Sequence, residues 1–241
     1  MQKEEIFDVI IVGGSYAGLS AAMSLGRSLR KVLVIDSGKP CNHQTPHSHN
    51  FLTRDGETPA ELAAIAKAQV LAYPTVKIIN AFAESAANTD LGFEVKTADH
   101  QKFVSKKLVL ATGVKDVFPN VIGFAECWGI SVLHCPYCHG YEVKGKKLGV
   151  LANGEIGFEF SKLIYNLSKD LTIYTNGPIE IDEAGQQKLA SKNINIVAKQ
   201  IDELLHENGL VKNIKFKDGS TQQIDAIFAR VGMEQNTKII E

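Results

Sequence analysis

Residues 8–36 read DVIIVGGSYAGLSAAMSLGRSLRKVLVID, and this stretch decides the fold. The run VIIV at residues 9–12 is apolar and β-branched, which is typical of a parallel strand buried on both faces. Glycines follow it, and then LSAAMSLGRSL has small and apolar residues at helical spacing. A second apolar run, KVLVID, ends at Asp36. This order predicts a strand–helix–strand unit with parallel strands.

The turn between the first strand and the helix is the first candidate binding site. A dinucleotide turn uses one glycine for the tight bend, a second for close approach of the pyrophosphate and a third for helix–strand packing. Gly13, Ser15 and Gly18 hold these positions, with Gly14 beside the serine. The serine departs from the pattern, but its hydroxyl can contact a phosphate at the helix N-terminus. Asp36 stands where a carboxylate accepts ribose hydroxyls, so we expect a dinucleotide site. The alternative is a tight turn in some other α/β protein.

The same order of elements returns after Gly145. The segment KKLGVLANGEIGFEFSKLIYNLSKDLTIYTN predicts strand, glycine turn, amphipathic helix and strand. Ala152, Gly154 and Gly157 hold the positions of the three glycines. The second strand ends in TIYTNG, with neither the acid that NAD favours nor the arginines that favour NADP. A nicotinamide site and a lobe that keeps the fold without binding nicotinamide therefore both remain open.

The remaining segments complete an α/β protein of two Rossmann-type lobes. We expect a helix at about 59–72 and a β-meander within residues 76–113, packed on the first lobe and broken at 88–92 and 99–101. The meander is expected to lead into a buried strand, KLVLATG, at 107–113. The lobe boundary is expected near residue 116, which gives lobes at 1–116 and 117–241. After residue 193, strand-like runs alternate with Asn-Gly and Asp-Gly turns.

Composition excludes several classes of partner. Lysine and arginine number 26 against 27 acidic residues, which argues against binding of nucleic acid or anionic membranes. The apolar run near the start is too short for a signal peptide or a membrane span, so we expect a cytoplasmic protein. In a reducing compartment, a close pair of cysteines is more often catalytic or metal-binding than structural.

The stretch SVLHCPYCHGYE at 131–142 carries such a pair, Cys135 and Cys138. A zinc site needs about four ligands, and the usual second ligand pair is missing, although the separate loop CNHQTPHSHN at 41–50 could bridge to it. An inert buried pair is a second alternative. A redox pair fits better, because the first thiol can begin a helix with Pro136 at its first position. His139 could move the proton that thiol chemistry transfers, and Glu142 could hold its imidazole.

These motifs together resemble the low-molecular-weight thioredoxin reductase family of flavoproteins over nearly the whole chain. VIIVGGSYAGLSAA resembles the FAD pyrophosphate turn, LVLATG the second FAD contact segment and CPYCHGYE the redox motif. The resemblance implies an FAD-dependent thiol–disulfide oxidoreductase in which Cys135 and Cys138 exchange electrons with the isoalloxazine. It implies an FAD-binding lobe at 1–116 and an NAD(P)-binding-like lobe at 117–241. The implied FAD contacts are Gly13, Gly14, Ser15, Gly18, Asp36, Asn50, Ala111, Thr112 and Gly113.

Two departures from the family pattern bear on function. Thioredoxin reductases carry an aspartate after the second cysteine, whereas His139 stands here. The C-x-x-C-H-G-Y-E form is similar to a side branch that includes both bacterial reductase-like proteins and fungal oxidases that close dithiols with oxygen, so the direction of electron flow stays open. The chain also stops at NTKIIE, before the segment that returns to the FAD lobe in this family, and we expect an incomplete first lobe.

The resemblance further implies a substrate and an assembly state. The expected substrate is a thioredoxin-like protein or a small disulfide or dithiol, the electron donor is NADPH or NADH, and the expected assembly is a homodimer. The loop at 41–50 aligns with the stretch that runs toward the flavin, and His47 and His49 are candidate proton carriers. A non-catalytic nucleotide-binding module is the alternative of another class. No metal is expected.

Overall fold

The computed structural model describes residues 5–240 as an α/β protein with two compact units. The first unit contains residues 1–43, 59–116 and 233–241, and the second contains 44–58 and 117–232. The prediction of lobes at 1–116 and 117–241 placed 44–58 with the first lobe and 233–241 with the second. The functional assignment of the two lobes stays a prediction.

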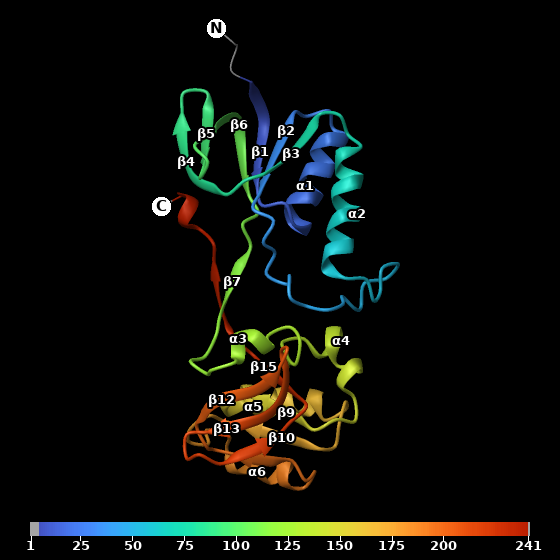
Figure 1. The fold of residues 1–241 in the computed structure, drawn as a ribbon, viewed down its shortest axis with the longest axis vertical. Coiled ribbons are helices and arrows are strands. Elements are labelled where there is room, and N and C mark those ends of the chain that lie inside the picture. Colours follow the sequence, from blue (N-terminus) through green and yellow to red (C-terminus); the bar gives the residue numbers. More distant parts are fainter. Residues whose placement is uncertain (1–4, 241) are drawn as a thin grey trace. The chain divides into compact units, whose positions relative to one another are not determined.

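One six-stranded sheet forms the first unit, in the order β3-β2-β1-β6-β5-β4 (Figure 1). Its elements are β1 (Ile6–Val12), α1 (Tyr16–Arg27), β2 (Val32–Asp36), α2 (Pro59–Leu71), β3 (Val76–Asn80), β4 (Ala83–Thr89), β5 (Gly92–Thr97) and β6 (Lys102–Leu110). β1 pairs in parallel with β2 and β6, as the strand–helix–strand prediction requires. A short 3-10 helix, η2 (Lys238–Ile240), also belongs to this unit, and Ile239 is buried in its core.

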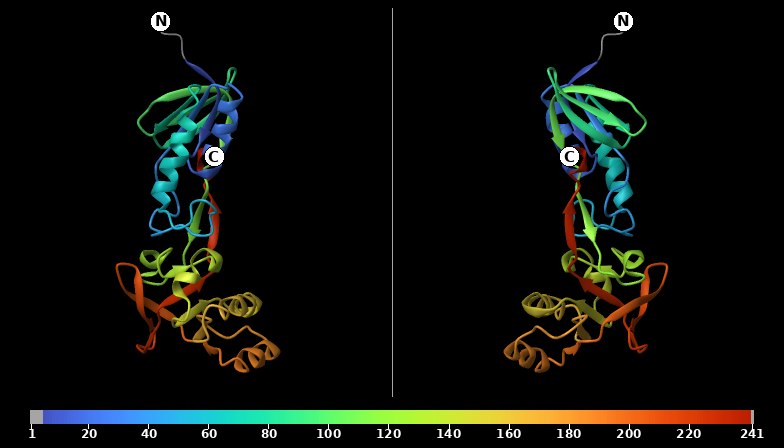
Figure 2. Two further views of the ribbon diagram at one scale, coloured as in Figure 1. Left: turned by 90° about the vertical axis from the view of Figure 1, so that its right-hand side faces the viewer. Right: turned by 90° about the vertical axis from the view of Figure 1, so that its left-hand side faces the viewer.

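Both faces of the parallel strands are covered, which explains their continuous apolar sequence. Val9, Ile11, Val32 and Val34 pack with residues of α1 and α2 on one face. Alternate residues of the same strands, together with Val95 of β5, form a second cluster on the other face. α1 and α2 lie side by side (Figures 1 and 2).

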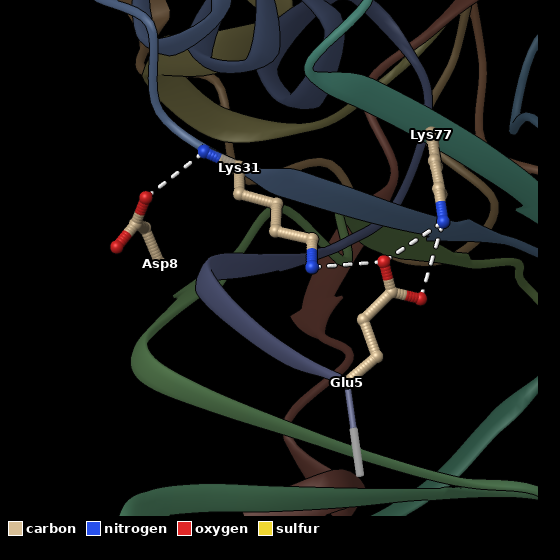
Figure 3. Close-up of polar contacts among 4 residues, drawn as sticks. All are labelled: Glu5, Asp8, Lys31 and Lys77. Atoms are coloured by element: carbon tan, nitrogen blue, oxygen red, sulfur yellow. Dashed lines mark hydrogen bonds and ion pairs between the residues drawn. The ribbon is translucent and has the colours of Figure 1, made fainter. Parts of the chain in front are cut away.

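Ion pairs join the strand ends farthest from the glycine turn (Figure 3). The Lys31 backbone N–H donates to Asp8 Oδ2 at 3.0 Å. Glu5 accepts from Lys31 Nζ at 2.9 Å and from Lys77 Nζ at 2.9 and 3.1 Å. These contacts join β1 and β3 to Lys31, the residue before β2, and exposed ion pairs of this kind add little to stability.

The predicted meander is partly corrected by the structure. β4, β5 and β6 are antiparallel neighbours as expected, with turns at the predicted breaks. β3, however, pairs in parallel with β2 and therefore belongs to the parallel part of the sheet. The meander is also not a separate layer, because β6 pairs with both β5 and β1. Alternation in sequence identifies a strand but not its partner, and this is why the prediction missed the arrangement.

The second unit repeats the plan with a parallel sheet in the order β11-β10-β9-β15-β8. Its elements are α3 (Phe124–Cys127), β8 (Val132–Leu133), α4 (Pro136–His139), η1 (Tyr141–Val143), β9 (Leu148–Leu151), α5 (Gly154–Ile164), β10 (Leu171–Tyr174), α6 (Glu183–Ala190), β11 (Asn195–Val197), β12 (Ile201–Glu207), β13 (Leu210–Phe216), β14 (Thr221–Gln223) and β15 (Ala226–Ala229). One core lies under α5 and α6, and another lies under the antiparallel sheet β12-β13-β14. Figure 2 shows these helices and strands on opposite sides of the parallel sheet.

Local turn chemistry accounts for the β12–β13 hairpin. Asn208 and Gly209 form its two-residue turn with φ of 51° and 79°, the backbone that the predicted Asn-Gly turn requires. Strands β7 (Val114–Val117) and β16 (Gly232–Gln235) pair with each other. Among residues 5–240, no helix is long and apolar enough to cross a membrane.

Candidate active site

The redox motif begins directly after β8. Cys135 is the N-cap of α4 and Pro136 occupies the first helical position, as the sequence predicts. The two cysteines are free thiols whose sulfur atoms lie 2.7 Å apart, and both are partly buried. A C-x-x-C pair on one short helix therefore places the sulfurs where exchange between them is geometrically direct.

Burial determines the protonation of the second thiol. Desolvation raises the pKa of Cys138 to about 11, and its hydrogen bond and charge repulsion with Cys135 act in the same direction. The Cys138 thiol therefore remains protonated at neutral pH in the dithiol form. A base is needed before this sulfur can act as a nucleophile, because the thiolate is the reactive species.

His139 directly follows Cys138 and is in the neutral form that such a base requires. Burial lowers the pKa of His139, and His49 adds to this effect, while Glu142 and a hydrogen bond to the His47 backbone oppose it. Its Nε2 atom is buried and has no hydrogen-bond partner among the described residues. With the backbone of His47 bound to the other ring nitrogen, Nε2 carries the lone pair that can accept a proton.

A loop from the first third of the sequence packs on the redox motif. Residues 44–58 belong to the second unit, and Gln44 Nε2 donates to the backbone oxygens of Ala125, at 3.0 Å, and Trp128. His49 lies between two carboxylates, with Nε2 3.5 Å from Glu142 Oε1 and Nδ1 3.6 Å from Asp55 Oδ2. Glu142 thus contacts His49 and acts on His139 through its charge.

The first glycine turn holds a carboxylate at its centre. The Gly14 N–H donates to Asp36 Oδ1 at 3.1 Å, and Lys67 Nζ of α2 donates to Oδ2 at 3.0 Å. Burial acts to raise the pKa of Asp36, but hydrogen bonds from Lys67, Gly14 and Gly38 outweigh it and lower the pKa overall. Asp36 is therefore ionised and is an acceptor for ribose hydroxyls. Sequence reasoning missed Lys67, because α2 reaches Asp36 only through the tertiary fold.

Glycine is required at this turn by close backbone approaches. A Cβ on Gly13, where φ is 104°, would lie 2.2 Å from the Ala111 oxygen, and a Cβ on Gly18 would lie 1.8 Å from the Gly13 oxygen. The structure thus brings Ala111 and Thr112 to the turn. The predicted contact of Gly113 with FAD stays a prediction. Ser15 caps α1 without a side-chain hydrogen bond to the helix, so its hydroxyl is available to a phosphate. These features fit the ADP half of FAD.

Asn50 is the one predicted FAD contact that falls in the other unit. It has a φ of 61°, and its backbone N–H donates to Asp55 Oδ1 at 2.7 Å. The structure groups it with the redox motif and not with the residues of the first turn. Its predicted contact with the flavin stays a prediction.

The second glycine turn borders a cavity of about 350 Å³ within the second unit. Ala152 and Asn153 line it together with Thr175, Asn176 and Arg230. Asn153 caps α5, and its Oδ1 accepts from the backbone N–H groups of Gly154 at 2.9 Å and Glu180 at 3.0 Å. A Cβ on Gly157 would lie 2.9 Å from the Ala152 oxygen, so this turn is also tight.

Sequence reasoning missed three of these lining residues, Arg230, Thr175 and Asn176. The signal that could have found Arg230 is its position immediately after the predicted strand DAIFA, at the carboxyl edge of a parallel sheet, where ligands bind. The cavity and the N-terminus of α5 fit a nucleotide.

The remaining cysteines lie apart from the pair. Cys41 is exposed and belongs to the first unit, whereas Cys127 is buried, and desolvation raises its pKa to about 11. Within residues 5–240, no three histidine, cysteine or acidic side chains are gathered as metal ligands would be.

Comparison with known proteins identifies the family. The pyridine nucleotide-disulphide oxidoreductase family matches residues 7–241. Thioredoxin reductase aclD of Aspergillus oryzae is 35% identical over 228 residues, which cover 90% of this chain and 72% of that protein. Thioredoxin reductase tcpT of Claviceps purpurea is 36% identical over 232 residues, covering 91% and 72%. The solved structure of TrxB from Bacillus anthracis has a TM-score of 0.90 and 32% identity, covering 95% of this chain and 77% of that one. The chain therefore belongs to the pyridine nucleotide-disulphide oxidoreductases, as a thioredoxin reductase-like enzyme that uses FAD with NAD(P)H.

Proposed function

We propose that the protein catalyses thiol–disulfide exchange through Cys135 and Cys138, with a thioredoxin-like protein or a small disulfide as substrate. The observation that carries this proposal is the pair of sulfur atoms 2.7 Å apart, directly followed by the half-buried His139, whose Nε2 atom is buried and whose pKa is lowered by burial. FAD, when bound, supplies the electron pair that returns the cysteines to the dithiol, and NAD(P)H supplies that pair in turn.

The proposed thiol–disulfide exchange takes place in two steps. The thiolate of one cysteine attacks a substrate sulfur, forming a mixed disulfide and breaking the substrate S–S bond, and the departing sulfur takes up a proton. The second cysteine then attacks the first, which forms the Cys135–Cys138 disulfide and releases the second substrate thiol. Two electrons pass to the substrate. His139 Nε2 accepts the proton of an attacking thiol and returns it to a leaving sulfur.

The two cysteine variants test this proposal. We expect Cys135→Ser and Cys138→Ser each to reduce turnover of a disulfide substrate to background, with flavin binding retained. Cys41→Ser is the matched control, because Cys41 is exposed and lies in the first unit, and it should turn over normally. A Cys138→Ser protein with normal turnover would remove the pair from the mechanism.

A separate experiment tests the direction of electron flow. For a reductase, anaerobic NADH or NADPH should bleach the visible flavin band within the turnover time. If nicotinamide leaves the flavin oxidised and a dithiol in air releases peroxide, the chain is a dithiol oxidase that uses the same pair. A protein that neither binds flavin nor reacts with dithiols would be a non-catalytic module.

A further inference from the structure

We propose that Lys67 is a positioning residue of the cofactor site in the first unit, which holds the Asp36 carboxylate ready for a ribose and so sets how tightly FAD is retained. This inference goes beyond the cysteine chemistry, and it depends on the assignment of the first glycine turn to FAD. Asp36 is the expected acceptor for the ribose hydroxyls. Lys67 belongs to α2, 31 residues further along the chain, and is part of neither the turn nor its adjoining strands.

The Asp36 carboxylate is held from two sides. On one side, the Gly14 N–H donates to Oδ1 at 3.1 Å, and a Cβ on Gly14 would lie 2.7 Å from Asp36 Cγ, so the glycine permits this approach. The backbone N–H of Gly38 also donates to the carboxylate. On the other side, Lys67 Nζ donates to Oδ2 at 3.0 Å. The carboxylate is therefore directed toward the turn before any ligand binds.

The packing of α2 brings Lys67 to this position. Leu62 and Val70 are buried, and Ala66 packs against the cluster that contains Val70, so these residues mark the face of α2 that is covered. Lys67 directly follows Ala66 and borders that face, with 37% of its side chain exposed. Burial of the apolar face of the helix thus also places the lysine ammonium at the carboxyl end of β2.

Burial makes Asp36 dependent on this lysine. The Asp36 side chain is 16% exposed, against 26% for Asp8 and 44% for Glu5, which form the ion pairs at the other end of the strands. Burial acts to raise the pKa of Asp36, and the hydrogen bond from Lys67 is the strongest of the effects that oppose it. Without Lys67, the carboxylate would gain a proton more readily or turn toward water, and either change removes an acceptor for the ribose.

Lys67 supports ribose binding and does not compete with it, because both charged groups keep hydrogen-bonding capacity. An ionised carboxylate has about four lone-pair sites, and the donors observed here are Gly14, Gly38 and Lys67. A lysine ammonium has three N–H donors, one of which is directed at Asp36. A ribose hydroxyl can therefore donate to Asp36 and accept from Lys67 at the same time.

Equilibrium binding of FAD tests the role of Lys67 without turnover. The full chain is freed of flavin and titrated calorimetrically with FAD. We expect Lys67→Met, which keeps the length of the side chain and removes its charge, to weaken FAD binding about tenfold or more, the effect of losing one partner of a charged hydrogen bond. Lys67→Arg should restore most of the affinity. Lys106→Met is the matched control, because Lys106 pairs with Asp8 at 2.7 Å away from the turn, and the affinity should not change.

The pH dependence of FAD affinity distinguishes positioning of Asp36 from a general structural effect. In the unaltered chain, Asp36 should stay ionised until the pH falls below 3.8, the ordinary value for an aspartate, because its pKa is lowered. In Lys67→Met, the lysine no longer opposes the effect of burial, so the affinity should begin to fall at a higher pH. A purely structural defect would weaken binding equally at every pH at which circular dichroism shows an intact fold.

A double substitution tests whether Lys67 acts through Asp36. In an Asp36→Asn background, Lys67→Met should cause little further loss of FAD affinity, because the two residues belong to one interaction. An undiminished loss would mean that the lysine attracts the phosphates of FAD directly.

Three results would overturn the proposal: equal or tighter FAD binding by Lys67→Met, a loss of affinity that does not depend on pH, or an undiminished loss in the Asp36→Asn background. A chain that binds no FAD would overturn it together with the assignment of the first turn. Because no electron transfer is measured, these results are distinguishable from failure of the cysteine chemistry, which the Cys135 and Cys138 variants report.

Discussion

At the scale of single residues, proton transfer to and from the cysteine pair depends on the neutral imidazole of His139. Cys138 needs a base because burial raises its pKa to about 11. His139 can accept a proton because burial lowers its pKa and leaves Nε2 without a partner among residues 5–240. Burial therefore raises the pKa of the Cys138 thiol and also favours the neutral imidazole of His139, which can accept the thiol proton.

This arrangement predicts a dependence of activity on pH. The active form of His139 is neutral, so turnover should fall in acid only as the pH drops through a pKa below 6.5, its ordinary value. His139→Gln should lower turnover about 10²-fold or more and remove this acidic limb. The measurement is a pH–rate profile of both proteins with FAD bound. An identical profile in the variant would assign the limb to another group.

Stability should depend on pH through the same residue. With the folded pKa lowered, the unfolded chain binds more protons below pH 6.5, so the free energy of unfolding should fall as the pH drops through that range. His139→Gln should show a shallower fall in urea denaturation. His43→Gln is a suitable control, since His43 is exposed and its ring contacts the Pro40 backbone oxygen.

At the scale of elements, the β1–α1 turn depends on glycines that cannot accept a side chain. We expect Gly18→Ala to destabilise the protein by about 3 kcal/mol, the upper end of overpacking costs, because its Cβ would lie 1.8 Å from the Gly13 oxygen. The shift of helix from strand should also abolish flavin binding. Denaturant unfolding and the visible flavin absorbance of the purified protein measure the two effects.

Gly232→Ala is the matched control, because it distinguishes the steric clash at Gly18 from the loss of backbone freedom that any Gly→Ala substitution causes. Gly232 has no positive φ, and a Cβ there would meet no atom closer than 3.4 Å. Gly232→Ala should therefore retain the flavin and nearly all of the stability. Flavin content in Gly18→Ala equal to that of Gly232→Ala would contradict the assignment of the first turn to FAD.

At the scale of the whole molecule, each hydrophobic cluster is confined to one unit. Two clusters belong to the first unit and two to the second, so the chain has separate cores and is not expected to unfold in a single two-state transition. Ligand binding should therefore stabilise the units unequally.

The unequal stabilisation of the two units can be measured by comparing the FAD-bound protein with the apoprotein. At a concentration of 100 times its Kd, FAD should stabilise the first unit by about 2.7 kcal/mol relative to the apoprotein. Differential scanning calorimetry should then show one transition that moves with FAD and one that does not. A single transition that shifts as a whole would contradict independent cores.

Local sequence determined much of this protein. Apolar runs, glycine turns and Asp36 at a strand end predict the two Rossmann-type units, because burial on both faces and tight turns restrict residue type at each position. Cys135, Pro136 and Cys138 likewise predict the start of α4. Such features need only neighbours along the chain.

The tertiary structure alone decided which distant segments share a site. It grouped the loop at 44–58 with the redox motif, joined Lys67 to Asp36, and brought Glu180 to the Gly154 turn. These contacts join residues from different elements, and no local period in the sequence encodes them. They depend on strand order and loop packing, which the free energy of the whole fold determines.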